Sequence, residues 1–281
     1  MTVSSRCSEL LSVLLIAVVS VLSSLQAYGQ RNAWSVPQYK ESVRVGSVGY
    51  GHSFARDTYL SESRYDGWNL GLEFDSWKGL KPGRLFNTGR VHASLFFSPM
   101  TNRSGGGKTY QASGTAYFAG LWHAVDCSMC DLLVGPAGMV NIGALWNLQN
   151  SNNPANGEGY LAAGVCVDNT LRYRLFGYPM ALQATLYLPL AGVGIAPDYD
   201  KPYWFVYRYG EYGSVLHFIS PFNNAALTQQ VSLLLPVRSS CIRIGYTFDY
   251  IENRLGGHFT RLFNGYFTVG YAVKIQTLEW R

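Results

Sequence analysis

Two stretches near the C-terminus decide the fold: CIRIGYTFDY at residues 241–250 and YFTVGYAVKI at residues 266–275. In both, apolar or aromatic side chains alternate with polar or small ones. A period of two places successive side chains on opposite faces of a β-strand. The alternation recurs in other stretches, which predicts an all-β chain. These stretches are residues 41–52, 68–75, 90–97, 111–123, 134–148, 161–174, 182–188 and 225–237.

The composition favours a transmembrane barrel over a soluble sheet. Aromatic residues make up 15% of the chain and charged residues only 14%, whereas an average soluble protein has about 25% charged residues. After residue 29, no apolar run approaches the length of a membrane helix. We therefore predict an antiparallel up-and-down β-barrel in the bacterial outer membrane, with apolar side chains toward lipid and polar ones toward the lumen.

The N-terminus has the features of a cleaved signal peptide. Arg6 supplies a positive charge, residues 10–25 are apolar, and Ala27-Tyr28-Gly29 is a small-x-small cleavage site. An uncleaved anchor is the alternative, but the apolar run is short for a membrane span. Cleavage after Gly29 would leave residues 30–281 as a single exported barrel domain.

The connections between the predicted strands suggest an orientation. Polar connections at Phe54–Asp66, Pro99–Lys108 and Asn150–Glu158 are expected to face the outside, and short turns near Asp126, Gly177 and Arg238 the periplasm. The proline-containing segment Ala191–Asn224 is either one long loop with a short helix or two short strands. The barrel therefore has ten or twelve strands, and we favour twelve.

A set of ionisable side chains falls on the polar face of the predicted strands and is expected to line the lumen. Their charges nearly balance, which fits either a narrow channel or a wall linked by salt bridges. They are Glu73, Asp75, Arg90, His92, His123, Asp168, Arg172, Arg174, Arg243, Asp249 and Lys274. On the opposite faces, the side chains expected to meet lipid include Ile242, Tyr246 and Val269.

Three arrangements could support hydrolysis. His92 and Ser94 share a strand face, so the histidine could take the serine proton, but that face is the lumenal one. His217 and Ser220 are three residues apart and would need a β-bulge to meet. Glu73 and Asp75 could act as an acid–base pair, although a solvated charged wall is the commoner use of such residues. The catalytic residues therefore stay unassigned.

The net charge of +5 is scattered rather than clustered, so nucleic acid is not an expected partner. Cys127 and Cys130 lie in a predicted turn, where they form either a local disulfide or two free thiols. Two thiols with no partner pair are a poor zinc site. No cofactor and no metal are expected.

Three stretches resemble an uncharacterised family of outer-membrane barrel proteins from Bacteroidales, a domain of unknown function. They are Asp57–Ser61 with Tyr65–Gly67, Asn150–Ala155, and Tyr209–Glu211 leading into His217–Ser220 and Asn223. The resemblance implies an outer-membrane barrel, and it supplies no activity and no catalytic residues.

The preferred role is therefore a small channel or an envelope component. The alternatives are a hydrolase that acts on lipid or peptide, and a structural or surface-binding barrel. Expected partners are outer-membrane lipid, the barrel assembly machinery and, for a channel, a small-molecule solute. The sequence does not indicate an oligomeric state.

Overall fold

The computed structural model describes residues 36–151, 154–198, 203–237 and 240–276. The predicted signal peptide lies outside these residues. In the described part, the strands are β1 (Glu41–Asp57), β2 (Ser61–Gly79), β3 (Thr88–Asn102), β4 (Lys108–Asp126), β5 (Cys130–Asn147), β6 (Ala155–Leu175), β7 (Tyr178–Ile195), β8 (Leu216–Ile219), β9 (Asn224–Val237), β10 (Ser240–Asn253) and β11 (Thr260–Gln276). Two short helices precede β8, namely α2 (Tyr203–Tyr209) and the 3-10 turn η2 (Tyr212–Val215).

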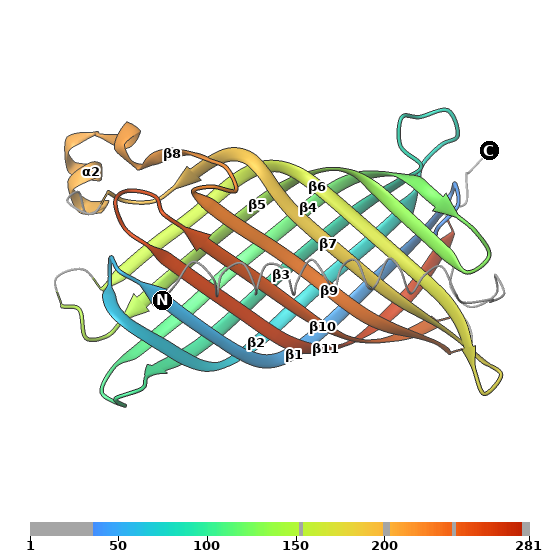
Figure 1. Cartoon of the computed structure of the whole chain (residues 1–281), viewed down its shortest axis with the longest axis horizontal. Coiled ribbons are helices and arrows are strands. Elements are labelled where there is room, and N and C mark those ends of the chain that lie inside the picture. The colour runs from blue at the N-terminus through green and yellow to red at the C-terminus, as the bar shows by residue number, and fades with distance from the viewer. Residues whose placement is uncertain (1–35, 152–153, 199–202, 238–239, 277–281) are drawn as a thin grey trace.

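Ten of these strands close into a ring (Figure 1). Strands that follow one another in the chain pair antiparallel from β1 to β7, and β9, β10 and β11 continue the ring. The pairing of β1 with β11 joins the two ends of the chain, from Glu41 opposite Gln276 to Asp57 opposite Thr260. The predicted antiparallel up-and-down barrel is thus confirmed. Closure leaves no free edge within the ring of ten strands, and a free edge is what a lipid environment would not tolerate.

The preference for twelve strands is wrong. Within Ala191–Asn224, β7 continues to Ile195, and the chain then forms α2, η2 and the four-residue strand β8. β8 pairs only with the last residues of β7, Gly192–Ile195, whereas β9 pairs with β7 over Ala181–Tyr187. β8 is therefore a short strand added to the edge of β7, and it is not one of the strands that form the barrel wall.

Two predicted loops turn out to be partly strand. β1 runs on to Asp57 and β2 begins at Ser61, so Phe54–Asp66 contains a turn of only three residues, 58–60. Likewise, Asn150–Glu158 ends inside β6, which begins at Ala155. Near the β1–β2 turn the exposed side chains of Arg56 and Glu62 are polar, and the start of β6 alternates small residues (Ala155, Gly157) with polar ones, so the apolar–polar alternation on which the sequence prediction relied fades.

We name the two ends of the barrel for their connections. The α2 end carries the β1–β2, β3–β4, β5–β6, β7–β9 and β10–β11 connections and lies at the left of Figure 1. The opposite end, the turn end, carries the other connections. One of these is the β6–β7 turn of Phe176 and Gly177, whose positive φ values of 50° and 80° are those of the two-residue hairpin turn that matches strand twist.

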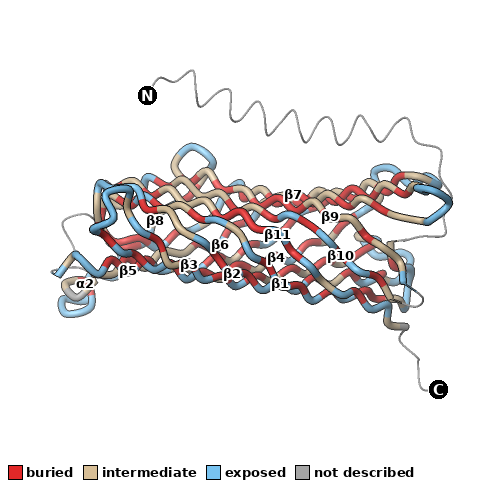
Figure 2. Tube along the Cα trace, turned by 90° about the horizontal axis from the view of Figure 1, so that it is seen from below, coloured by how far each residue is buried: buried red, intermediate tan, exposed pale blue. Residues whose placement is uncertain are grey.

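The interior of the barrel is polar. Figure 2 shows buried and more exposed residues alternating along the strands. On β2, for example, Asn69, Glu73 and Asp75 are buried while Leu70, Leu72 and Phe74 are exposed. This inversion of the soluble pattern is the one expected of a transmembrane barrel.

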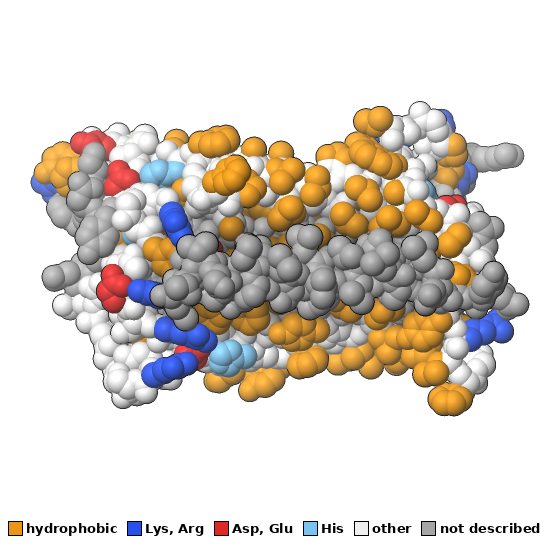
Figure 3. All heavy atoms as spheres, in the orientation of Figure 1, with side chains coloured by type: hydrophobic (Ala, Val, Ile, Leu, Met, Phe, Trp, Pro, Cys, Tyr) orange, Lys and Arg blue, Asp and Glu red, His pale blue; other side chains and the backbone are white. Residues whose placement is uncertain are grey.

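The exterior carries an apolar belt. It includes Val48, Leu72, Leu95, Phe118, Ile142, Leu161 and Val269, each more than half exposed. Figure 3 shows hydrophobic side chains over the middle of the visible face and charged ones toward the two ends. An exposed apolar surface of this extent is what a lipid bilayer covers. In the described residues, no helix is long and apolar enough to cross a membrane.

The belt predicts that the cost of a charge depends on its place on the outside. Leu72 (58% exposed) lies within the belt, and Leu85 (82% exposed) lies in the β2–β3 connection. Leu72→Arg should lower the free energy of unfolding by about 2–4 kcal/mol, the cost of Arg near a bilayer midplane, and Leu85→Arg should change it little. Urea unfolding in lipid vesicles measures both; equal effects would contradict the membrane assignment.

Candidate functional site

At mid-height the barrel interior holds a group of charged side chains that we call the central cluster. Its members are fully or almost fully buried and come from strands on different sides of the ring. They are Glu73 and Asp75 on β2, Arg90 and His92 on β3, Asp168 on β6 and Arg243 on β10.

Arg90 reaches across the bore. Its Nη1 donates to Thr185 Oγ1 on β7 (2.7 Å) and pairs with the Asp168 carboxylate. Its Nη2 donates to Gln230 Oε1 on β9 (3.1 Å). In the ring order, β3 and β9 are separated by the same number of strands in both directions. One side chain therefore connects diametrically opposite walls.

Arg243 fills the part of the bore that Arg90 does not cross. Its guanidinium pairs with Asp75, and its Nη2 donates to Glu73 Oε2 at 2.7 Å. Asp75 also accepts from Arg90 Nη2 (3.2 Å) and lies 2.9 Å from His92 Nδ1. Each carboxylate of the cluster thus has an arginine partner, as a dry interior requires.

Aromatic rings fill the space around the ion pairs. The Arg90 guanidinium lies 4.4 Å from the centre of the Trp77 ring and 5.4 Å from that of Tyr187. Tyr187 stacks on Tyr117 with ring centroids 4.1 Å apart, and the Tyr117 hydroxyl bonds to Thr228 on β9. Together with the arginines, these rings occlude the bore at this height.

The other residues predicted to line the lumen lie elsewhere. Asp249 is buried and accepts from Thr228 Oγ1, and Arg172 is buried near the turn end with Asp131. His123 is half-buried, and Arg174 and Lys274 are exposed near strand ends. Lys274 Nζ pairs with Glu41 Oε1 at 2.9 Å. The latter three therefore do not join the buried interior.

The residue pairs that the sequence suggested for hydrolysis interact with other groups. His92 and Ser94 are both buried, and His92 is engaged with Asp75. His217 Nε2 lies 3.1 Å from the Ala196 carbonyl oxygen, while Ser220 Oγ donates to Asn223 Oδ1. Glu73 and Asp75 are bound by arginines. None of the described cysteines, Cys127, Cys130, Cys166 and Cys241, is in a disulfide.

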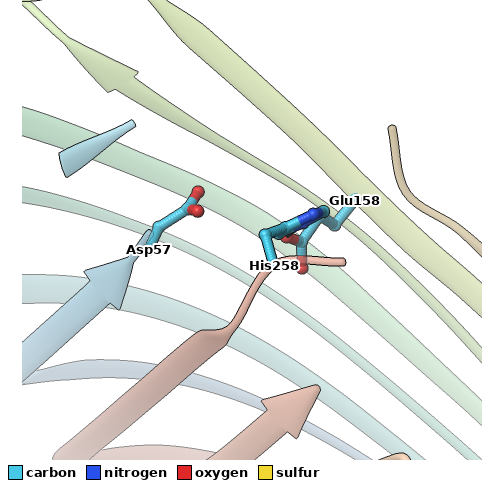
Figure 4. Close-up of side chains that lie close together, drawn as sticks. All are labelled: Asp57, Glu158 and His258. Atoms are coloured by element: carbon cyan, nitrogen blue, oxygen red, sulfur yellow. Dashed lines mark hydrogen bonds and ion pairs between the residues drawn. The ribbon is translucent and has the colours of Figure 1, made fainter. Parts of the chain in front are cut away.

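A second group, which we call the rim cluster, lies at the α2 end. Asp57 is the last residue of β1, Glu158 is near the start of β6, and His258 is in the β10–β11 connection. Figure 4 shows the three side chains converging from these separate parts of the wall. One possible ligand atom from each lies within 4.8 Å of the others.

Hydrogen bonds tie the rim cluster across the mouth of the barrel. Asn156 Nδ2 donates to Asp57 Oδ2 (2.7 Å) and to Glu158 Oε1 (2.8 Å). Glu158 Oε1 also accepts from Thr260 Oγ1 (2.6 Å) and lies 3.4 Å from His258 Nε2. Because β1 and β6 are opposite in the ring, the Asn156–Asp57 bond spans the bore as Arg90 does.

The rim cluster lies beyond the apolar belt, and burial perturbs its acid–base chemistry. Burial, with the nearby charge of Glu158, raises the pKa of Asp57 to about 7. Burial alone would lower the pKa of His258, but its interactions with Glu158, then with Asp57 and the Gly256 carbonyl, raise it. A carboxyl with such a pKa can gain or lose a proton near neutral pH.

The rim cluster was not predicted from the sequence. Asp57 and Glu158 fall inside predicted loops, and His258 falls between the last two predicted strands, where no local pattern marks it. Successive connections of an up-and-down barrel lie at alternate ends. This rule places the segments that contain Asp57, Glu158 and His258 at the same end of the barrel, and it could have predicted that the three residues lie close together.

Between the two clusters lie small cavities lined by both polar and apolar side chains. One of about 30 Å³ is bordered by Gln111, Asn141, Glu158 and Asn253, and one of about 10 Å³ by Tyr117, Thr228 and Asp249. The larger has room for about two water molecules. These volumes are those of isolated hydration sites and not of a channel.

Comparisons with known proteins identify a family and distant structural neighbours. A family model described as "Protein of unknown function (DUF3316)" matches residues 12–281. The outer membrane protease OmpT of Escherichia coli is similar at a TM-score of 0.48 and 8% identity, covering 89% of this chain and 99% of that one. The translocator domain of the autotransporter NalP of Neisseria meningitidis follows at 0.36 and 11%, covering 95% and 96%. The chain matches no curated protein.

The central cluster yields a test of stability. Arg243→Leu would remove the arginine that pairs with Glu73 and one of the two arginines that pair with Asp75. The free energy of unfolding should therefore fall by about 3–5 kcal/mol. Arg261→Leu is the matched control, because Arg261 pairs with Glu252 (2.7 Å) in a partly exposed position. Its loss should be about 0–1 kcal/mol. Urea unfolding in micelles measures both losses. Equal losses of stability in the two variants would contradict the role given to Arg243.

Proposed function

The chain belongs to the DUF3316 family, and we propose that it is a closed barrel of the bacterial outer membrane, an envelope component without an open channel at rest. The observation that carries this proposal is the contact of Arg90 on β3 with Gln230 on the opposite strand β9. A bore bridged by one buried side chain, with ion pairs and stacked rings around it, has no room for a solute.

The outer membrane is the proposed location because the belt is apolar and the interior polar. Export would use the signal peptide predicted before Gln30, and insertion would use the barrel assembly machinery. The α2 end would face the outside and the turn end the periplasm, as usual for bacterial barrels with short periplasmic turns. A Bacteroidales source, implied by the sequence resemblance, is part of the same proposal.

The channel version of the proposal requires the central cluster to open. Arg90 and Arg243 would have to leave Asp75, Asp168 and Glu73, and each separation would place charges in a nearly dry interior. Passage of a small solute is therefore a gated event in this proposal. The hydrolase alternative has less support, because Ser220 donates to Asn223, Glu73 is bound by an arginine, and His92 and Ser94 are buried in the occluded bore.

A surface-binding role is the second candidate, and aromatic side chains at the α2 end favour it. Tyr207 is 79% exposed, Tyr212 57% and Phe222 96%. Exposed aromatic side chains are enriched where proteins bind one another. Such a role is compatible with a closed bore.

Planar bilayer recording tests the closed barrel. The wild-type protein should give no channel steps, because Arg90 and Arg243 occlude the bore. The double variant Arg90→Ala/Arg243→Ala should give steps, since it removes both side chains. Arg174→Ala, an exposed arginine near the turn end, is the matched control and should stay silent. Steady conductance by the wild-type protein would sink the proposal.

A further inference from the structure

We propose that the rim cluster binds a divalent transition-metal ion, with His258, Asp57 and Glu158 as the protein ligands. The three donors come from distant parts of the sequence, and one possible ligand atom of each lies within 4.8 Å of the others. This proposal goes beyond the closed barrel and does not depend on it.

The donor set has the composition of a metal site. An imidazole nitrogen with two carboxylate oxygens suits Zn²⁺ and similar ions, whereas Ca²⁺ and Mg²⁺ prefer oxygen alone. Ligands at about 2.0–2.2 Å from a tetrahedral zinc ion lie about 3.4 Å from one another. Small rotations of the side chains bring the cluster to that spacing and leave a fourth position open.

The two clusters in this barrel differ in how their buried carboxylates are compensated. In the central cluster, Glu73, Asp75 and Asp168 each pair with an arginine. In the described part of the chain, no Lys or Arg pairs with Asp57 or Glu158, and His258 is the one cationic group at ion-pair distance. Buried carboxylates are normally paired with cations or coordinated to metals.

Unsatisfied buried polar atoms add an independent observation. Asn156 and Asn253 are at least 95% buried, and each donates its amide Nδ2 to the cluster carboxylates. Their Oδ1 atoms have no hydrogen-bond partner. The orientation of an amide is assigned from its surroundings. Turned by 180°, each would aim its oxygen at the same carboxylates, which is favourable only with a cation between them.

A metal ion at this position would fasten the mouth of the barrel. Asp57 and Glu158 lie on β1 and β6, which are opposite in the ring, and His258 belongs to the β10–β11 connection. A bound ion would link these three parts of the wall, and stabilise the folded barrel because the unfolded chain lacks the site.

Titration of the full chain, folded in detergent and stripped of metal, tests the site with Zn²⁺ as the probe. Calorimetry should show one Zn²⁺ per chain, and Asp57→Asn and His258→Gln should each raise the Kd at least tenfold. The matched control is His217→Gln, since His217 lies 3.9 Å from the single carboxylate of Asp198; it should bind like the wild type. Saturating Zn²⁺ should raise the Tm of the wild type and of His217→Gln but not of the other two.

Folding of each variant is checked by its heat-dependent mobility on gels, and only folded variants are compared. If Asp57→Asn does not fold, His258→Gln and Glu158→Gln decide the question. A wild-type chain that binds no Zn²⁺ overturns the proposal. So does a chain whose binding is unchanged by every folded rim-cluster variant.

Discussion

The structure depends on one constraint: the charge of Arg90 is buried at the centre of a membrane barrel and must be neutralised there. Its nearest partners come from β2, β6, β7 and β9, so the requirement is met only when both halves of the wall are in place. Ten strands give a bore narrow enough for a single arginine to cross. The central cluster therefore favours this strand number and register, in addition to closing the bore.

The same barrel is bridged again at the rim, but by different chemistry. There, the amide of Asn156 joins carboxylates on opposite strands, and His258 joins from a connection. Between the two levels lie cavities with room for only about one or two water molecules each. The interior is consequently a series of polar layers instead of a passage, in contrast to wide barrels whose lumen is a water-filled channel.

The sequence predicted the alternation of strand faces, which the bilayer imposes. It did not predict the strand ends or the side-chain contacts between distant parts of the chain. Within the belt, alternation assigned faces such as those of Ile242 and Arg243, because lipid on one side and a polar interior on the other impose a period of two. Beyond the belt, water meets the outer face, the contrast disappears, and β1 and β6 were predicted too short. The pairing of Asp57 with Asn156 joins residues 99 positions apart, which no local pattern encodes.

The candidate sites show the same division. Placing Glu73, Asp75 and Arg90 on inward faces required only their phase, but their ion pairs required the ring order. The nearly balanced charges of the predicted lumen residues fitted either an open or a filled bore. The contacts of Arg90 and Arg243 show that the bore is filled. A crystal structure of the protein in a lipid phase tests this claim most directly. The account predicts the Arg90 guanidinium within hydrogen-bond distance of Asp168, Thr185 and Gln230; a continuous water-filled bore between β3 and β9 would contradict it.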